Sequence, residues 1–186
     1  MQKQDSSYEL VTDRGDKIRV DGVIAGIGIV PNVELARTTG LKVANGIAVD
    51  DTLHTNQPDI FAAGDVAEFS NPTLGKRLRI EHEDNANTMG KQAGRNMAGA
   101  NEPYHHLSFF YSDLFELGYE AVGELNPRLE TFVDWSIPMK KGVVYYLAGG
   151  RVRGVLLWNV WDSVPKARAL IAEPGPFTAA DLKGRL

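Results

Sequence analysis

The chain carries a carboxylate at a position where an α/β sheet could use it for chemistry. Residues 60–63 are an apolar run of the kind found in strands covered on both faces, and Gly64 and Asp65 follow directly. Gly64 allows the backbone to turn or to approach a ligand closely. Asp65 would then lie at the carboxyl end of a strand, where open α/β sheets bind ligands. An ordinary turn at a strand end explains the same residues, so this pattern predicts a candidate binding residue only.

A second group of candidate residues, Glu81, His82 and Glu83, stands where a helical pattern over about residues 83–98 begins. The unpaired N–H groups and the dipole of a helix favour negative charge at its N-terminus. We predict no metal site here, because the sequence lacks a His-Glu-x-x-His pattern and consecutive residues do not converge on one ion.

The same helical pattern carries small residues at every fourth position. Ala86, Gly90, Gly94 and Ala98 would form one ridge with almost no side chains. Each helical glycine costs roughly 1 kcal/mol relative to alanine, so we expect a close neighbour against this ridge. A strand, another helix and a flat ligand are all compatible with it.

Composition excludes several classes of function. The 186 residues are 43% hydrophobic and 24% charged, with a formal net charge of −4, so we expect no nucleic-acid partner and no membrane partner. The chain has no cysteine, which excludes disulfides, thiolate metal sites and a redox-active dithiol. Any redox chemistry must therefore come from a bound cofactor. Cytoplasmic localisation is the default expectation.

The element pattern predicts an α+β fold: a partial α/β segment followed by an antiparallel sheet with flanking helices. In the first half we expect a hairpin over residues 8–20, a strand over 23–29, a short helix capped by Asn32, and a strand over 46–50. In the second half, the expected strands are 107–111, 118–125, 129–135, 142–147 and 151–160, the last of them central. A helix capped by Asp162 or Ser163 and a short helix after Thr178 should follow them.

Taken together, several segments resemble the apoptosis-inducing-factor-like flavoproteins, close to the bacterial ferredoxin reductases, within the FAD-dependent pyridine nucleotide-disulfide oxidoreductase superfamily. The resemblance runs from about residue 17 to about 174, and its six segments occur in the expected order. These segments are 26–36, 60–65, 79–86, 110–114, 118–123 and 141–171. It implies hydride transfer from NAD(P)H to FAD and electron transfer to an acceptor protein.

The resemblance also implies roles for individual residues, none of them catalytic in its own right. Gly64, Asp65, His82, Glu83 and Tyr111 would contact FAD, with Asp65 on the ribityl chain. Gly28, Glu81, His82 and Glu120 would contact NAD. The family usually has tryptophan where Tyr111 stands, which would alter nicotinamide stacking.

The sequence departs most from the family by what it lacks. No Gly-x-Gly-x-x-Gly fingerprint occurs, although each dinucleotide needs one for its pyrophosphate. We therefore expect a remnant of an NAD-binding domain (residues 1–30), the last segment of an FAD-binding domain (31–100) and a C-terminal reductase or dimerisation domain (101–186). Such a truncated chain would be inactive alone and bind FAD weakly, and would act with a missing N-terminal half or as a homo-oligomer. The alternative is a stand-alone, non-catalytic dimerisation or interaction module.

Overall fold

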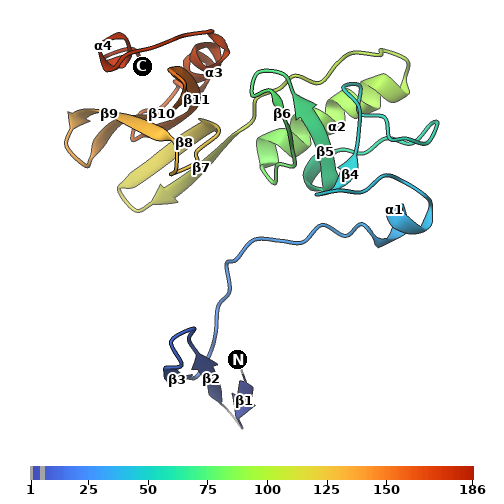
Figure 1. The fold of residues 1–186 in the computed structure, drawn as a ribbon, viewed down its shortest axis with the longest axis horizontal. Coiled ribbons are helices and arrows are strands. Elements are labelled where there is room, and N and C mark those ends of the chain that lie inside the picture. The colour runs from blue at the N-terminus through green and yellow to red at the C-terminus, as the bar shows by residue number, and fades with distance from the viewer. Residues whose placement is uncertain (1, 5–6) are drawn as a thin grey trace. The chain divides into compact units, whose positions relative to one another are not determined.

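The computed structural model describes residues 2–4 and 7–186, which form two compact units (Figure 1). The first unit comprises residues 1–30 and the second comprises residues 31–186. The candidate residues are unevenly divided between them: Gly28 belongs to the first unit, and all the others belong to the second.

The first unit is a small antiparallel sheet of three strands in the order β1-β2-β3. The strands are β1 (Gln2–Gln4), β2 (Ser7–Val11) and β3 (Lys17–Val20). The predicted hairpin is confirmed, with Tyr8 opposite Val20 and Val11 opposite Lys17. The predicted strand over residues 23–29 is wrong: this stretch has no regular structure, and Ile24 is fully exposed. Its apolar sequence suits a strand, but no described strand pairs with it.

The second unit begins with several short elements followed by one long helix. These are α1 (Glu34–Thr38), β4 (Ile47–Ala48), the 3₁₀ helix η1 (Gly64–Val66), β5 (Ala67–Asn71), β6 (Lys76–Leu78) and α2 (Glu83–Met97). Strand β4 runs parallel to β5, and β6 runs antiparallel to it. Their core contains Val49, Leu53, Ala62, Ala67, Phe69, Met89, Ala93 and Tyr104. The predicted long helix is confirmed.

Two local predictions in this region are wrong. Residues 60–63 are not a strand, because their only ladder contact is a single bridge between Phe61 and His54. Asn32 does not cap α1, whose N-cap is Val33 with no side-chain hydrogen bond. Gly64 nevertheless adopts the turn that its position suggested, with a φ of +75°.

The rest of the second unit is a five-stranded antiparallel sheet in the order β7-β8-β11-β10-β9. Its strands are β7 (Phe109–Leu114), β8 (Leu117–Gly123), β9 (Glu130–Ile137), β10 (Lys141–Ala148) and β11 (Arg151–Trp158). Strand β11 is central, as predicted. Helix α3 (Val164–Ala172) packs against β8 and β11, with Val164, Ala167, Leu170 and Ile171 buried. A Thr178–Asp181 capping box begins α4 (Ala179–Leu182).

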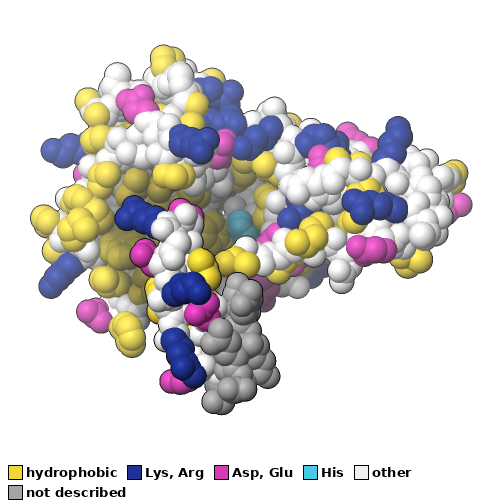
Figure 2. Space-filling view, turned by 60° about the horizontal axis from the view of Figure 1, so that its bottom comes forward, with side chains coloured by type: hydrophobic (Ala, Val, Ile, Leu, Met, Phe, Trp, Pro, Cys, Tyr) yellow, Lys and Arg dark blue, Asp and Glu magenta, His cyan; other side chains and the backbone are white. Residues whose placement is uncertain are grey.

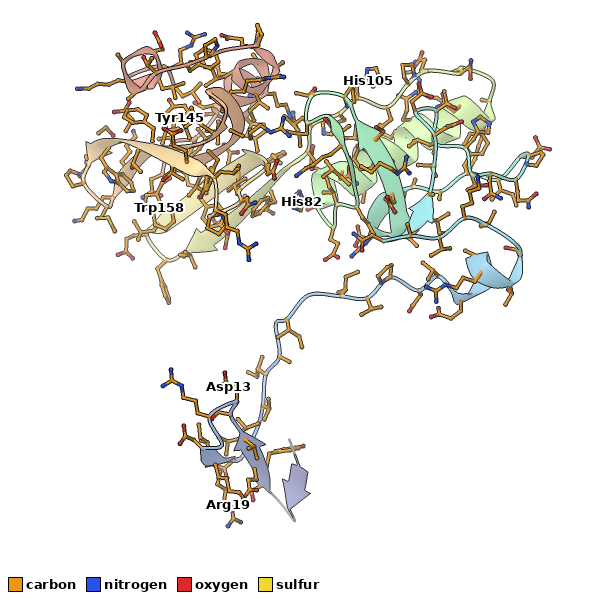
Figure 3. The ribbon with its side chains drawn as sticks, in the orientation of Figure 1. Asp13, Arg19, His82, His105, Tyr145 and Trp158 are labelled. Atoms are coloured by element: carbon orange, nitrogen blue, oxygen red, sulfur yellow. The ribbon has the colours of Figure 1, made fainter. Side chains whose placement is uncertain are left out.

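Hydrophobic side chains also gather on the face of this sheet that α3 does not cover (Figure 2). Val133 and Ile137 of β9 are 40% and 51% exposed there. Tyr119 of β8 stacks on Trp158 of β11 at a centroid distance of 6.0 Å. This uncovered face lies beside the start of α2, where His82 is found (Figure 3).

We expected a close neighbour against the small-residue ridge of α2, but the middle of the ridge is open. Among the described residues, a Cβ added at Gly90 or Gly94 would meet no atom within 4 Å outside its own stretch of helix, and both glycines are exposed. Ala86, at the start of the ridge, has a close neighbour in Gly64 of η1. Across residues 2–4 and 7–186, no helix has the length and apolar character needed to cross a bilayer.

Candidate functional site

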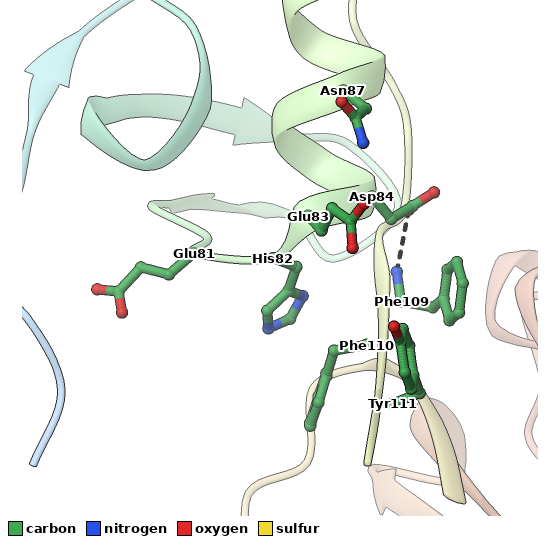
Figure 4. Close-up of a pocket in the computed structure, with 8 residues that line it drawn as sticks. All are labelled: Glu81, His82, Glu83, Asp84, Asn87, Phe109, Phe110 and Tyr111. Carbon is green, nitrogen blue, oxygen red and sulfur yellow. Dashed lines mark hydrogen bonds between the residues drawn. The ribbon is translucent and has the colours of Figure 1, made fainter. Parts of the chain in front are cut away.

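A cavity of about 680 Å³ opens between the N-terminus of α2 and strand β7 (Figure 4). This volume lies within the range of small-molecule and cofactor sites. The helix side and the strand side contribute the lining residues Glu81, His82, Glu83, Asp84, Asn87, Phe109, Phe110 and Tyr111. Four predicted residues, Glu81, His82, Glu83 and Tyr111, are therefore brought together in one site.

His82 is the N-cap residue of α2 and connects the helix to the strand side. Its Nδ1 lies 3.1 Å from the Ser108 hydroxyl, and its ring lies 4.6 Å from that of Phe110 between centroids. Burial lowers the pKa of the imidazole below 6.5, although the carboxylates of Asp84, Asp65 and Glu81 act in the opposite direction. The imidazole is therefore largely neutral at pH 7, so it can both donate and accept a hydrogen bond.

Three carboxylates line the cavity, but two of them already have cationic partners. Glu81 pairs with Arg79 at 2.8 Å. Asp84 pairs with Arg168 at 3.0 Å. The positive end of α2 also favours Glu83 and Asp84, which lie in its first turn. The negative charge facing a ligand is therefore smaller than the residue types suggest.

Gly64 and Asp65 lie in η1, next to the cavity but outside its lining. The Gly64 N–H points at the Met89 sulfur of α2, 3.3 Å away. The Asp65 carbonyl accepts a hydrogen bond of 3.0 Å from Arg79, the arginine that also pairs with Glu81. One guanidinium therefore connects the predicted ribityl-binding turn to the predicted nicotinamide-binding carboxylate.

The other predicted residues differ in how close they lie to the cavity. Tyr111 of β7 is 59% exposed and forms part of the cavity wall. Glu120 of β8 pairs with Tyr111 across the strands but does not line the cavity. Burial, with Asp162 nearby, raises the pKa of Glu120, and its Oε2 is buried without a hydrogen-bond partner. Gly28 belongs to the first unit, with a φ of +83°, and its NAD contact stays a prediction.

Sequence reasoning missed several residues that build this site: Asp84, Asn87, Ser108, Phe109 and Phe110. Asp84 and Phe110 fall within segments that carried the family resemblance, but they were given no role. The aromatic run before Tyr111 was a usable signal, because aromatic side chains offer flat apolar surfaces on which a ring can stack. Nothing in the local sequence indicated that Ser108 would contact His82.

Comparison with known proteins decides the family. The model of the pyridine nucleotide-disulphide oxidoreductase family matches residues 1–90. The model of the C-terminal domain of mitochondrion-associated apoptosis-inducing factor matches residues 93–140 and 133–173. The chain belongs to the pyridine nucleotide-disulphide oxidoreductases. The family resemblance and the α+β fold class expected from the sequence are both confirmed.

Three similar proteins illustrate the family. The ferredoxin–NAD(+) reductase component of the anthranilate 1,2-dioxygenase system of Burkholderia cepacia is 37% identical, over 91% of this chain and 43% of that protein. Apoptosis-inducing factor 1 of Dictyostelium discoideum is 35% identical, over 86% of this chain and 32% of that protein. The crystal structure of the covalent putidaredoxin reductase–putidaredoxin complex has a TM-score of 0.77 and 32% identity, covering 88% of this chain and 39% of the matched one. The chain thus spans less than half the length of these relatives.

The family implies FAD and NAD(P)H, and the residues present fit one end of the flavin. The cavity offers what a flat isoalloxazine with a polar edge requires: aromatic walls from Phe110 and Tyr111, and the N-terminus of the 15-residue helix α2. The adenosine end is different, because the 186 residues contain no Gly-x-Gly-x-x-Gly loop to hold a pyrophosphate. The fit therefore extends to the ring and ribityl end only.

Proposed function

We propose that this chain supplies the ring-binding part of an FAD-dependent NAD(P)H oxidoreductase that reduces a ferredoxin-type acceptor protein. The cavity between α2 and β7 carries the proposal, because it brings together four residues expected around the flavin and nicotinamide. Bound flavin would supply the redox chemistry by accepting a hydride and releasing electrons to the acceptor. A stand-alone interaction module is not favoured, because such a module would have no need of this cavity.

The side chains of the site position the rings and tune their surroundings. Tyr111 and Phe110 offer flat apolar surfaces for stacking, and the neutral His82 imidazole offers a polar edge held in place by Ser108. Asp65 would accept a hydrogen bond from the ribityl chain, because its carboxylate is exposed beside the cavity. Residues 1–30, 31–100 and 101–186 would correspond to NAD-binding, FAD-binding and C-terminal domain segments of the family.

The 186-residue chain alone should bind FAD weakly and show no NAD(P)H oxidase activity. The test is a titration with FAD, following flavin absorbance and fluorescence, on chain purified without added flavin. We expect colourless protein and a dissociation constant in the micromolar range or weaker. A flavin that co-purifies in equal amount would show that no further pyrophosphate loop is required.

The site itself is tested in a chimera that carries the upstream part of the Burkholderia cepacia relative in front of this chain. We expect the chimera to be yellow and to reduce ferricyanide with NADH. Tyr111→Ala should slow flavin reduction, whereas Phe115→Ala should not, because Phe115 is a fully exposed aromatic at the β7–β8 turn, outside the cavity lining. Equal effects of the two substitutions, or a folded chimera without flavin, would contradict the proposal.

A further inference from the structure

One guanidinium, that of Arg168 on α3, joins the two walls of the cavity without lining it. Its Nη2 donates to Asp84 Oδ2 at 3.0 Å, and its Nε donates to the Leu107 carbonyl at 2.7 Å. Its planar group also lies over the Phe109 ring, 5.6 Å from the centroid. Asp84 belongs to α2, whereas Leu107 and Phe109 lead into and begin β7. Arg168 therefore contacts both walls directly.

Asp84 is the point where these contacts converge. The same Oδ2 accepts hydrogen bonds from His106 Nε2 at 2.6 Å and from the Phe109 backbone N–H at 3.2 Å. The short contact with His106 requires its Nε2 to carry the hydrogen, so the nearby Arg168 Nη2 directs its own hydrogen to Asp84. Charge-assisted bonds of this kind are the strong ones, and all the groups are at least two-thirds buried.

The distances along the chain from this junction at Asp84 to the proposed ring site, formed by His82, Phe110 and Tyr111, are short. His82 precedes Asp84 by two residues, and Phe110 and Tyr111 follow Phe109 directly. A shift of α2 relative to β7 at the junction is therefore transmitted to the contact between the His82 and Phe110 rings. Side chains that bind flat rings must be held to within a fraction of an ångström by their supporting groups.

We propose that Arg168 is a positioning residue of the ring site, acting through Asp84 to fix the spacing between the α2 N-terminus and β7. Helix α3 is thereby part of the binding site, although none of its side chains lines the cavity. Lysine cannot replace arginine here, because its single ammonium cannot reach a carboxylate, a carbonyl and a ring face in this fixed geometry. The proposal rests on the proposed function for its purpose, but its geometry can be tested without flavin.

The test follows the His82 side chain by NMR in the flavin-free 186-residue chain labelled with ¹³C-histidine. The Phe110 ring, 4.6 Å away, imposes a ring-current shift on the imidazole protons, and His82→Asn identifies their signals. Arg168→Met should move these signals towards the values of free histidine, and Arg168→Lys should give an intermediate shift. The matched control is Arg185→Met, because Arg185 also pairs with a carboxylate, Glu173, and lies over a phenylalanine ring, Phe177, without contacting α2.

His82 signals that stay in place in folded Arg168→Met would overturn the proposal, as would an equal shift in Arg185→Met. Amide spectra of the central strands β10 and β11 show whether each variant is folded. Should Arg168→Met not fold, Arg168→Lys and Asp84→Asn decide the question by the same signals. Because no flavin is used, a failure of FAD binding bears on the proposed function alone.

Discussion

At the scale of single residues, His82 shows how the fold sets the charge of the candidate site. Its ring is taken out of water between α2, Ser108 and Phe110, and this desolvation is the largest influence on its pKa. The neighbouring carboxylates oppose the effect but do not cancel it. A neutral imidazole suits the proposed role of the site, which is to accept uncharged ring edges, whereas an imidazolium would add a fixed positive charge to it.

Because the pKa of His82 is lower in the folded chain than in the unfolded chain, stability should depend on pH with a definite sign. Above pH 6.5 both states are largely neutral at this position, and its contribution is fully present. As the pH falls below 6.5, the unfolded state binds the proton more readily and stability is lost. Urea unfolding between pH 7.5 and 5.5 should therefore show a shallower pH dependence in His82→Asn than in the unmodified chain.

The matched control for this titration is Asn87→Ala, because Asn87 lines the same cavity and carries no titratable group. Its substitution should leave the slope of stability against pH unchanged. The same slope in His82→Asn and in the unmodified chain would show that burial does not lower the pKa of His82.

The sequence predicted the cavity-lining residues better than the residues that hold them in place. Glu81, His82, Glu83 and Tyr111 were expected together because they lie in two family segments, and the fold brings them to one cavity. The contacts from Ser108 and Arg168 could not be predicted, because they join positions 26 and 84 residues apart in sequence. Side-chain pairing over such separations depends on tertiary packing, which local patterns do not encode.

At the scale of elements, predictions succeeded where a segment's partners lie nearby in the chain. The strands of the C-terminal sheet pair mostly with sequence neighbours through tight turns, and α2 needs no partner for its backbone hydrogen bonds. The stretches 23–29 and 60–63 are as apolar as real strands, yet neither is one. A strand exists only with a neighbour to pair with, and composition cannot supply that neighbour.

Replacing glycine by alanine should have opposite effects on the stability of the chain in α2 and in β8. Gly90→Ala should stabilise the chain by about 0.5–1 kcal/mol, since the added methyl group meets open space and alanine favours the helix. Gly123→Ala should destabilise it, because the new Cβ would clash with the Arg153 carbonyl oxygen at a φ of +79°. Urea unfolding midpoints measure both changes.

A loss of stability in Gly90→Ala would indicate that another surface packs against the ridge of α2 in solution. Gly94→Ala tests the same effect at a second position, because Gly94 lies one turn further along the same open face of α2. Agreement of the two alanine variants would locate the effect on the ridge and not at one residue.

At the scale of the whole molecule, the second unit is held together by two cores that share a boundary. One core lies between the five-stranded sheet and α3, and the other lies beneath α2. Leu78 of β6 packs against both, and Leu74 contributes to the sheet core from the loop before β6. The Asp84–Arg168 pair bridges the same boundary with charge. The expected division near residue 100 therefore falls inside one compact unit, and it remains a prediction about family domains.

The position of both cores predicts that residues 31–186 fold without residues 1–30. Every buried residue of the two clusters lies between Val49 and Leu182, so removing the first unit takes away no member of either cluster. A chain beginning at Pro31 should keep the thermal midpoint, the amide spectrum of the five-stranded sheet and the ring-current shift of His82. A lower midpoint with broadened His82 signals would show that the first unit supports the ring site. Deleting residues 1–20 alone would then distinguish the hairpin from the apolar stretch that follows it.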